Sequence, residues 1–188
     1  MRVLVGDITK VQNIDAIVNA SNALGIMGSG VAGAIARSGG DLLKQNVKKV
    51  IDEKGPFQLG DIFVSDSGRL KRRGIKHVYH AVTMEFAGGG TSVGTIGPLL
   101  TRVLEKALSE GLESIAFGGL GCGIGGLTKE EVAKRMAHIS QEYNGRIKIT
   151  VIDTSEDFIK AFLDNLSIEV ETINEEETIN KPSDSSPE

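Results

Sequence analysis

The sequence predicts an α/β fold built around a mainly parallel sheet. Short apolar runs of strand length alternate along the chain with longer segments of helical periodicity, as expected for strands joined by crossover helices. The 24 glycines concentrate in loops that follow expected strands. With 188 residues, 40% of them hydrophobic and 24% charged, the chain can bury a substantial core within one domain.

The first third of the chain contains two expected strands and two expected helices. The second strand is apolar throughout, which suits burial on both faces of a sheet. The first helix is rich in alanine, and the second has apolar residues at helical spacing and is ended by Gly55 and Pro56. The expected strands cover residues 1–5 and 16–20, and the expected helices cover residues 31–36 and 41–54.

The rest of the chain continues the alternation. One helix has a single apolar face and is closed by Gly111. Another begins with a capping-box pattern, in which Thr128 precedes Glu131 by three residues. The expected strands cover residues 61–65, 76–82, 114–117 and 147–152, and the expected helices cover residues 97–110, a segment that begins at 128, and residues 157–166.

Charge divides the chain into a body, residues 1–166, and an acidic tail, residues 167–188. The tail holds seven of the 25 acidic residues and one of the 21 basic residues, which leaves the body with 18 acids, 20 bases and a net charge of +2. We expect the tail to be disordered, although residues 167–173 alternate weakly and could form a strand. The near-neutral body argues against a nucleic-acid partner, and the short basic run 71–73 is expected to be a solvated surface.

Composition also excludes several classes of protein. The chain has no run of about 18 apolar residues, so no membrane span is expected. The single cysteine, Cys122, has no internal disulfide partner, and Asp7 comes too early for a secretory signal, so we expect a cytoplasmic protein. Aromatic residues make up only 4%, which argues against a stacking platform for single-stranded nucleic acid.

Two glycine-rich loops, residues 22–33 and 118–126, are the candidate binding elements. Each follows an expected buried strand and leads into a helix, so both should lie at the carboxyl edge of the sheet, where α/β proteins bind ligands. Glycine allows backbone N–H groups to face a ligand closely, and a helix N-terminus adds positive potential. Two such loops could hold the two phosphates of a diphosphate.

A Rossmann-type NAD-binding oxidoreductase is the alternative interpretation of these loops. Each contains a G-x-G-x-x-G pattern, and Asp153, at the end of a later strand, could bind a ribose. The first loop is too far from its strand for the tight Rossmann turn, however, and the second is followed by only one clear strand. Two fingerprints in one small domain are also more than one NAD requires.

Several motifs together resemble the macro domain family. They are Gly6-Asp7-Ile8-Thr9, Asp15 to Asn22, Gly28 to Ile35, His80-Ala81-Val82, and Ser114 to Phe117 leading into Gly121 to Leu127. Their order and spacing cover residues 1 to about 166, and the combination is more specific than any one of them. The resemblance implies a three-layer α/β/α fold with a mixed, mainly parallel sheet, and an ADP-ribose cleft at its edge.

The resemblance also implies roles for individual residues. Asp7 would accept a hydrogen bond from the adenine amino group, with Ile8 beside it, and Asn22 would face the distal ribose. Asp7 as a turn residue and Asn22 as a loop residue bonded to its own backbone are the simpler alternatives. The remaining implied ligand contacts are Gly30, Val31 and Ala32 in the first loop, and Gly119, Leu120, Gly121, Cys122, Gly123, Ile124 and Gly125 in the second.

The chain departs from the family where catalysis is concerned. Members that remove ADP-ribose from acidic side chains commonly carry an aspartate where this chain has Ala32. At the position of Gly125, another branch of the family has an aspartate and many members have an aromatic residue. Two candidate catalytic residues remain. Asn22 could hold a water together with the substrate phosphate, and His80 could act as an acid or base, with a structural role for His80 as the alternative. Cys122 is expected to pack rather than attack.

The expected ligands are therefore ADP-ribose and its derivatives, with ADP-ribosylated proteins as candidate partners. Hydrolysis of ADP-ribose 1″-phosphate, O-acetyl-ADP-ribose or ADP-ribosylated protein esters is the activity that the family would add. No metal and no cofactor are implied.

Overall fold

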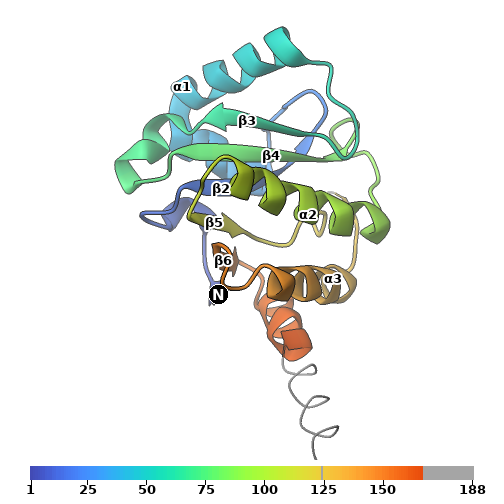
Figure 1. The fold of residues 1–188 in the computed structure, drawn as a ribbon. Coiled ribbons are helices and arrows are strands. Elements are labelled where there is room, and N and C mark those ends of the chain that lie inside the picture. Colours follow the sequence, from blue (N-terminus) through green and yellow to red (C-terminus); the bar gives the residue numbers. More distant parts are fainter. Residues whose placement is uncertain (124, 167–188) are drawn as a thin grey trace, which may run out of the picture.

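The computed structural model describes residues 1–123 and 125–166, and its fold is a six-stranded sheet between two layers of helices (Figure 1). The strands are β1 (Arg2–Val5), β2 (Ala16–Asn22), β3 (Ile62–Asp66), β4 (His77–Met84), β5 (Ser114–Phe117) and β6 (Lys148–Asp153). The helices are α1 (Gly30–Lys54), α2 (Val93–Ser109), α3 (Lys129–Glu142) and a last helix over residues 156–166, with short 3₁₀ helices η1 (Ile8–Lys10) and η2 (Gly68–Arg73). The expected tail, residues 167–188, lies outside the described residues.

The sheet is mixed and mainly parallel, as the sequence predicted. Its strand order is β1-β6-β5-β2-β4-β3. All neighbouring strands run parallel except β3, an edge strand that pairs antiparallel with β4. Because five strands share one direction, their carboxyl ends meet at one edge of the sheet.

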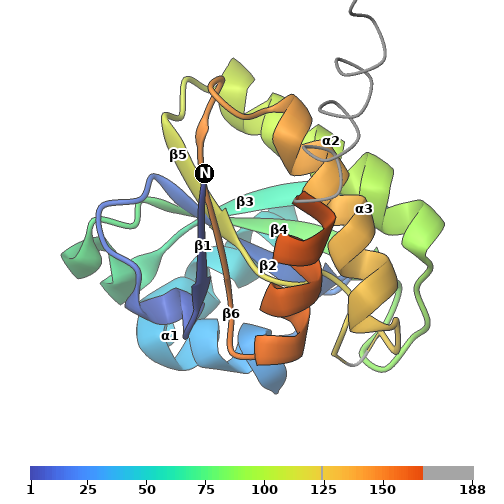
Figure 2. The ribbon, with the colours of Figure 1, turned by 90° about the horizontal axis from the view of Figure 1, so that it is seen from below.

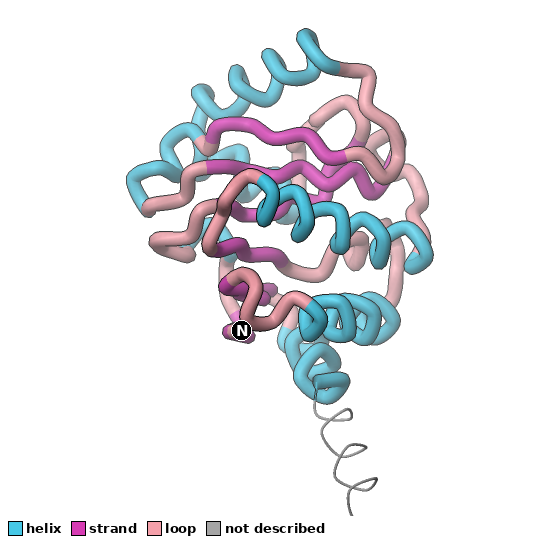
Figure 3. The backbone as a smooth tube through the Cα atoms, viewed as in Figure 1, coloured by secondary structure: helices cyan, strands magenta, loops and turns pink. Residues whose placement is uncertain are grey.

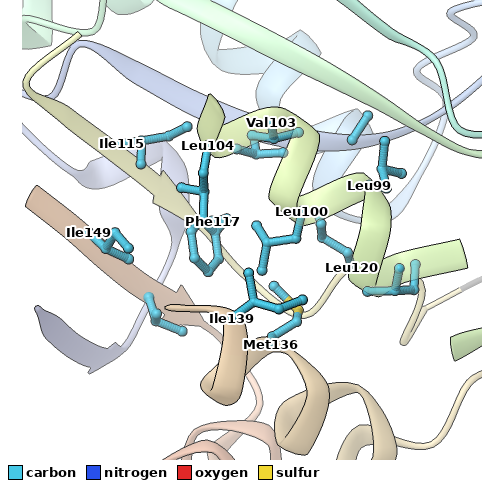
Figure 4. Close-up of a cluster of buried hydrophobic side chains, with 14 of the residues drawn as sticks. Leu99, Leu100, Val103, Leu104, Ile115, Phe117, Leu120, Met136, Ile139 and Ile149 are labelled. Carbon is cyan, nitrogen blue, oxygen red and sulfur yellow. The ribbon is translucent and has the colours of Figure 1, made fainter. Parts of the chain in front are cut away.

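Helices cover both faces of this sheet (Figures 2 and 3). Strand β2 shows how: Ile17 packs in the cluster that contains the α1 side chains, whereas Val18 packs in the cluster that contains α2 and α3. The larger cluster has Phe117 near its middle, with Leu100 of α2 and Ile139 of α3 nearby (Figure 4). This alternation explains why β2 reads as an uninterrupted apolar run in the sequence.

Helix α1 bends at Gly40, whose backbone has φ 71° and ψ −168°. The two helices expected over residues 31–36 and 41–54 are the two arms of this bent helix. Glycine adopts a positive φ without the strain that a Cβ would cause. The first arm runs from the carboxyl edge of the sheet, and the bend redirects the second arm along β3.

The structure corrects one expected boundary. Helix α2 begins at Val93, four residues before the expected start at Gly97, because Ser92 caps it by accepting a hydrogen bond from the Thr95 backbone N–H. The expected N-cap at Thr128 is confirmed, since its side chain accepts from the Glu131 N–H. The Glu131 carboxylate accepts from the Thr128 hydroxyl and not from the Thr128 backbone N–H of a full capping box. Within the described residues, none of the helices is both long and apolar enough to cross a membrane.

Candidate functional site

A cleft runs along the edge of the sheet where the parallel strands end. It has two halves, with volumes of about 210 and 260 Å³. Together they fall within the range of roughly 300–1,000 Å³ that is usual for small-molecule sites. The carboxyl ends of the strands and the loops that follow them therefore line one elongated cavity.

The half of about 210 Å³ lies between the two glycine-rich loops and the end of β4, and we call it the inner half. Its lining is mainly small or apolar. The lining residues are Ala20, Ser21, Asn22, Ile26, Gly28, Ser29, Gly30, Val31, Ala32, Met84, Ala87, Gly119, Gly121, Gly123 and Gly125.

The half of about 260 Å³ lies at the ends of β1, β5 and β6, and we call it the outer half. It includes two carboxylates. The lining residues are Gly6, Asp7, Ile8, Gly30, Val31, Ala34, Gly118, Ile152, Asp153 and Thr154.

The two halves share Gly30 and Val31, which begin helix α1. The preceding residue, Ser29, makes no capping hydrogen bond with its side chain. The first N–H groups of the helix therefore have no side-chain acceptor. Uncapped amides at the positive end of a helix favour a negatively charged group, and these lie at the middle of the cleft.

Residues of the second glycine-rich loop differ in whether they face the cleft or the core. Gly119, Gly121, Gly123 and Gly125 line the inner half. Leu120 points the other way: it is 2% exposed and belongs to the larger core cluster. At Gly125, a Cβ would lie 2.7 Å from the Gly121 carbonyl oxygen, so an aromatic residue would not fit there in this loop conformation.

Cys122 and Ile124 are the other two predicted ligand contacts of this loop that are not glycines lining the inner half. Cys122 packs against the larger cluster, and burial raises the pKa of its thiol to about 11, so the thiol is protonated at neutral pH. This favours the packing role expected for it over a nucleophilic one. Ile124 lies outside the described residues.

Asp7 lies in the outer half and also caps η1. Its Oδ1 atom accepts hydrogen bonds from the backbone N–H and the hydroxyl of Thr9, both at 2.8 Å. Among the described residues, no protein donor contacts Oδ2. One carboxylate oxygen is thus used by the turn, and the other is free to accept from a ligand.

Both carboxylate oxygens of Asp153 accept hydrogen bonds from the protein backbone. Its Oδ2 accepts from the Gly119 N–H at 2.9 Å and its Oδ1 from the Ser155 N–H at 2.8 Å. Its carbonyl oxygen accepts from the Gly6 N–H at 2.9 Å. Asp153 therefore joins the ends of β1 and β6 to the second glycine-rich loop.

Asn22 lines the inner half, but its side chain is engaged by its own loop. Its Oδ1 accepts from the N–H groups of Leu24 and Ile26, both at 3.1 Å, and its Nδ2 donates to the Ile26 carbonyl at 2.9 Å. This is the simpler of the two roles expected for Asn22. One N–H of the amide is left for a ligand or a water.

His80 lies outside the cleft. It is 0% exposed, stacks on Phe63 at 4.5 Å, and has one ring nitrogen 3.2 Å from Asn19 Nδ2 and the other 2.9 Å from Ser65 Oγ. A neutral ring satisfies both contacts by accepting at Nδ1 and donating from Nε2. Burial lowers the pKa of His80 to about 3. This geometry favours the structural role over the acid–base role.

The buried His80 should make the protein less stable in mild acid. The unfolded chain takes up a proton at this residue near pH 6.5, whereas the folded chain does so only near pH 3. Stability is therefore lost as the pH falls through this window, at up to roughly 1.4 kcal/mol per pH unit. We expect urea unfolding of the His80→Gln variant to have a flatter pH dependence between pH 7 and 5. Parallel curves for the two proteins would contradict this explanation.

The sequence missed several lining residues. Met84 ends β4, Ala87 follows it, and Thr154 follows β6. The common signal is position, because each comes at or just after the carboxyl end of a parallel strand. Among the described residues, no group of three or more His, Cys, Asp and Glu side chains could hold a metal ion.

Comparisons with known proteins show which family this chain resembles in sequence. Residues 18–136 match the model of the family described as Macro domain. An uncharacterized protein of Aquifex aeolicus is 32% identical over 164 residues, which are 86% of this chain and 94% of the relative.

Two solved structures illustrate the similarity of fold. The Oceanobacillus iheyensis macrodomain with MES bound has a TM-score of 0.79 at 21% identity, over 90% of this chain and 92% of that one. The Trypanosoma brucei macrodomain in complex with ADP-ribose has a TM-score of 0.70 at 24% identity, over 86% and 67% of the two chains. These findings do not favour the Rossmann alternative.

Proposed function

This chain belongs to the macro domain family, and from that premise we propose that its cleft binds ADP-ribose and derivatives of ADP-ribose. The family and the fold support this ligand, since a structural neighbour is a macrodomain in complex with ADP-ribose. The cleft supports it independently, because one half can take the adenosine of such a molecule and the other half its distal ribose.

The observation that carries the proposal is the uncapped N-terminus of α1 at the junction of the two halves. Ser29 leaves the first amides of the helix without a side-chain acceptor, and Gly30 and Val31 line both halves. Gly121 and Gly123 of the second glycine-rich loop line the inner half as well, so their backbone N–H groups are the further candidate donors. A diphosphate in this place would receive hydrogen bonds from both sides without any Lys or Arg.

The carboxylate of Asp7 sets the direction of the ligand. Its free Oδ2 can accept a hydrogen bond from the exocyclic amine of adenine, so the adenosine would occupy the outer half. The distal ribose would then occupy the inner half, against Asn22 and the glycines of the second loop. Val31 and Ile26, which are 48% and 53% exposed, stand at the mouth of that half, where an ADP-ribosylated protein could approach.

We favour binding over hydrolysis as the principal function. Among the described residues that line the inner half there is no carboxylate, imidazole or thiol. His80 is buried elsewhere, and Asn22 is engaged by its loop. Hydrolysis of ADP-ribose 1″-phosphate, O-acetyl-ADP-ribose or ADP-ribosylated esters would have to rely on a water activated by the substrate's own phosphate.

Isothermal titration calorimetry of the purified chain tests the proposal, with ADP-ribose, NAD and AMP as parallel ligands. We expect ADP-ribose to bind with a Kd in the micromolar range, about −8 kcal/mol. NAD should bind more weakly, because the distal ribose would carry nicotinamide into an inner half of only about 210 Å³. AMP should bind more weakly because it lacks the second phosphate and the distal ribose. Equal affinity for ADP-ribose and AMP would show that the inner half contributes nothing, and would overturn the proposal.

A further inference from the structure

A second hollow, of about 530 Å³, lies away from the cleft, and we call it the arginine hollow. The first arm of α1 separates the two sites: Gly30 at its start lines the cleft, and Ser38, eight residues later, lines the hollow. At 1.5 Å per residue, this places them about 12 Å apart along the helix. The residues that line the arginine hollow are Gln12, Asn13, Ser38, Arg69, Leu70, Arg72, Arg73 and Gly74.

Close backbone contacts fix the walls of the hollow. The Asn13 N–H donates to the Arg73 carbonyl at 2.8 Å, which joins the segment before β2 to η2. Gly68 has φ 59°, and a Cβ there would lie 2.5 Å from the Gly39 carbonyl oxygen, so η2 rests directly on the bend of α1. The hollow is thus part of the rigid fold and not a gap between loose loops.

The bend in α1 also positions one arginine. The Arg69 side chain lies over Gly40, with its Nε atom 2.9 Å from where a Cβ of that residue would be. A larger residue at position 40 would push this side chain away. The glycine that permits the bend therefore also gives Arg69 its place in the wall.

The positive charge of the hollow is not neutralised within the described residues. Asp66 pairs with Lys71, outside the lining, and its Oδ1 accepts from the Gly68 N–H. The three arginines of the lining have no carboxylate partner there, and none of the eight lining residues is acidic. Backbone N–H groups serve the carbonyls of η2: Gly74 donates to Leu70 and Lys71, and Asn13 donates to Arg73.

These groups suit one class of ligand. Guanidinium groups present forked N–H donors that match the oxygens of a phosphate, and neighbouring amide and hydroxyl groups can donate further hydrogen bonds. Gln12, Asn13 and Ser38 supply such groups. Among the described residues, no aromatic side chain lines the hollow, so these residues offer no ring on which a nucleobase could stack.

We propose that the arginine hollow is a second anion site, which binds the phosphate groups of a phosphorylated ligand through Arg69, Arg72 and Arg73. It is independent of the ADP-ribose cleft. The phosphate can belong to a small molecule or to a nucleic-acid backbone, and the test distinguishes these sources.

The first experiment is a titration of the full chain with sodium pyrophosphate, followed by ¹H–¹⁵N NMR. The backbone signals of Asn13 and Gly74 report the hollow, and those of Gly119 and Gly121 report the cleft. We expect both sets to shift in the wild type. In an Arg69→Ala, Arg72→Ala, Arg73→Ala variant, the hollow signals should require at least roughly tenfold more pyrophosphate, while the cleft signals titrate as before.

Two further variants separate a built site from charge alone. The control is a triple variant that removes the same charge from exposed bases with no ion pair among the described residues: Lys54→Ala, Lys134→Ala, Lys148→Ala. It should leave the hollow signals unchanged. Arginine-to-lysine changes at positions 69, 72 and 73 keep the charge but lose the forks, and affinity should fall between the wild type and the alanine variant. Equal losses in the arginine-to-alanine and control variants would overturn the proposal.

A fluorescently labelled DNA duplex of 12 base pairs identifies the source. If the backbone of a nucleic acid is the ligand, anisotropy should show binding that weakens with salt, with a log–log slope near −2.7 for three neutralised phosphates, and the alanine variant should abolish it. Pyrophosphate shifts at the hollow without duplex binding would assign a small phosphorylated ligand. No shift at Asn13 and Gly74 and no duplex binding would overturn the proposal, whatever happens at the cleft.

Discussion

Replacement of Asp7 by alanine should weaken ADP-ribose binding by roughly 10- to 100-fold, the loss expected when one hydrogen bond to a charged acceptor is removed from a binding site. The free Oδ2 of Asp7 lines the outer half of the cleft, where the adenosine is proposed to bind. Calorimetry of the variant against ADP-ribose measures the loss. Unchanged affinity would place the adenine elsewhere.

The alanine variant also removes the cap of η1, so a second variant must separate the two effects. Asp7→Asn can keep Oδ1 as the acceptor of the two Thr9 hydrogen bonds, and its stability should stay close to that of the wild type. Its amide would, however, present a donor to the adenine amino group, which is also a donor. We therefore expect a loss of affinity at nearly unchanged melting temperature.

The same variant makes a sharper prediction about the base. Inosine diphosphate ribose has a carbonyl acceptor in place of the adenine amine. The wild type should prefer the adenine ligand, because a carboxylate can only accept. Asp7→Asn should reverse the preference, since its amide can donate to the carbonyl. If both proteins rank the two ligands alike, Asp7 does not contact that edge of the base.

The sequence predicted the fold well because its signals are local. The apolar run in β2, the N-cap Thr128 and the helix-ending Gly55 each act within a few residues, and each appears in the structure. The start of α2 was placed too late, because Ser92 stands in a polar, glycine-rich stretch that offers no apolar periodicity. A single side-chain cap decides that boundary, and its strength depends on geometry that the sequence does not display.

The candidate site was predictable in outline but not in the use of each side chain. The loops could be assigned to one edge of the sheet, because parallel strands end there. Two of the three backbone groups that donate to Asp153, the N–H groups of Gly119 and Gly6, come from 34 or more residues away along the chain. The arginine hollow could not be predicted for the same reason. The basic run 71–73 is typical of a solvated surface, and only the fold, with its bend in α1, brings Ser38 and Arg69 together with Arg72 and Arg73.

Replacement of Phe117 by alanine should lower the free energy of unfolding by about 3–5 kcal/mol. The Phe117 ring is 0% exposed and lies in the larger core cluster, between the sheet and helices α2 and α3 (Figure 4). Its removal would leave a cavity among side chains such as Leu104 and Ile139, which can only partly relax into it. Urea unfolding measures the change, with an unaltered m-value as the sign that the folded state keeps its compactness.

Phe86 provides the matched control, because it is the same residue type at 61% exposure. Phe86→Ala should change stability by less than about 0.5 kcal/mol, since little buried contact is lost. Equal losses at the two positions would contradict the placement of Phe117 in the core.

Phe117 also directly precedes Gly118, yet the Asp153 carboxylate holds the next residue, Gly119. ADP-ribose affinity should therefore survive in the folded Phe117→Ala protein, and a loss of affinity comparable to that of Asp7→Ala would mean that the ring, and not Asp153, sets the position of the second loop.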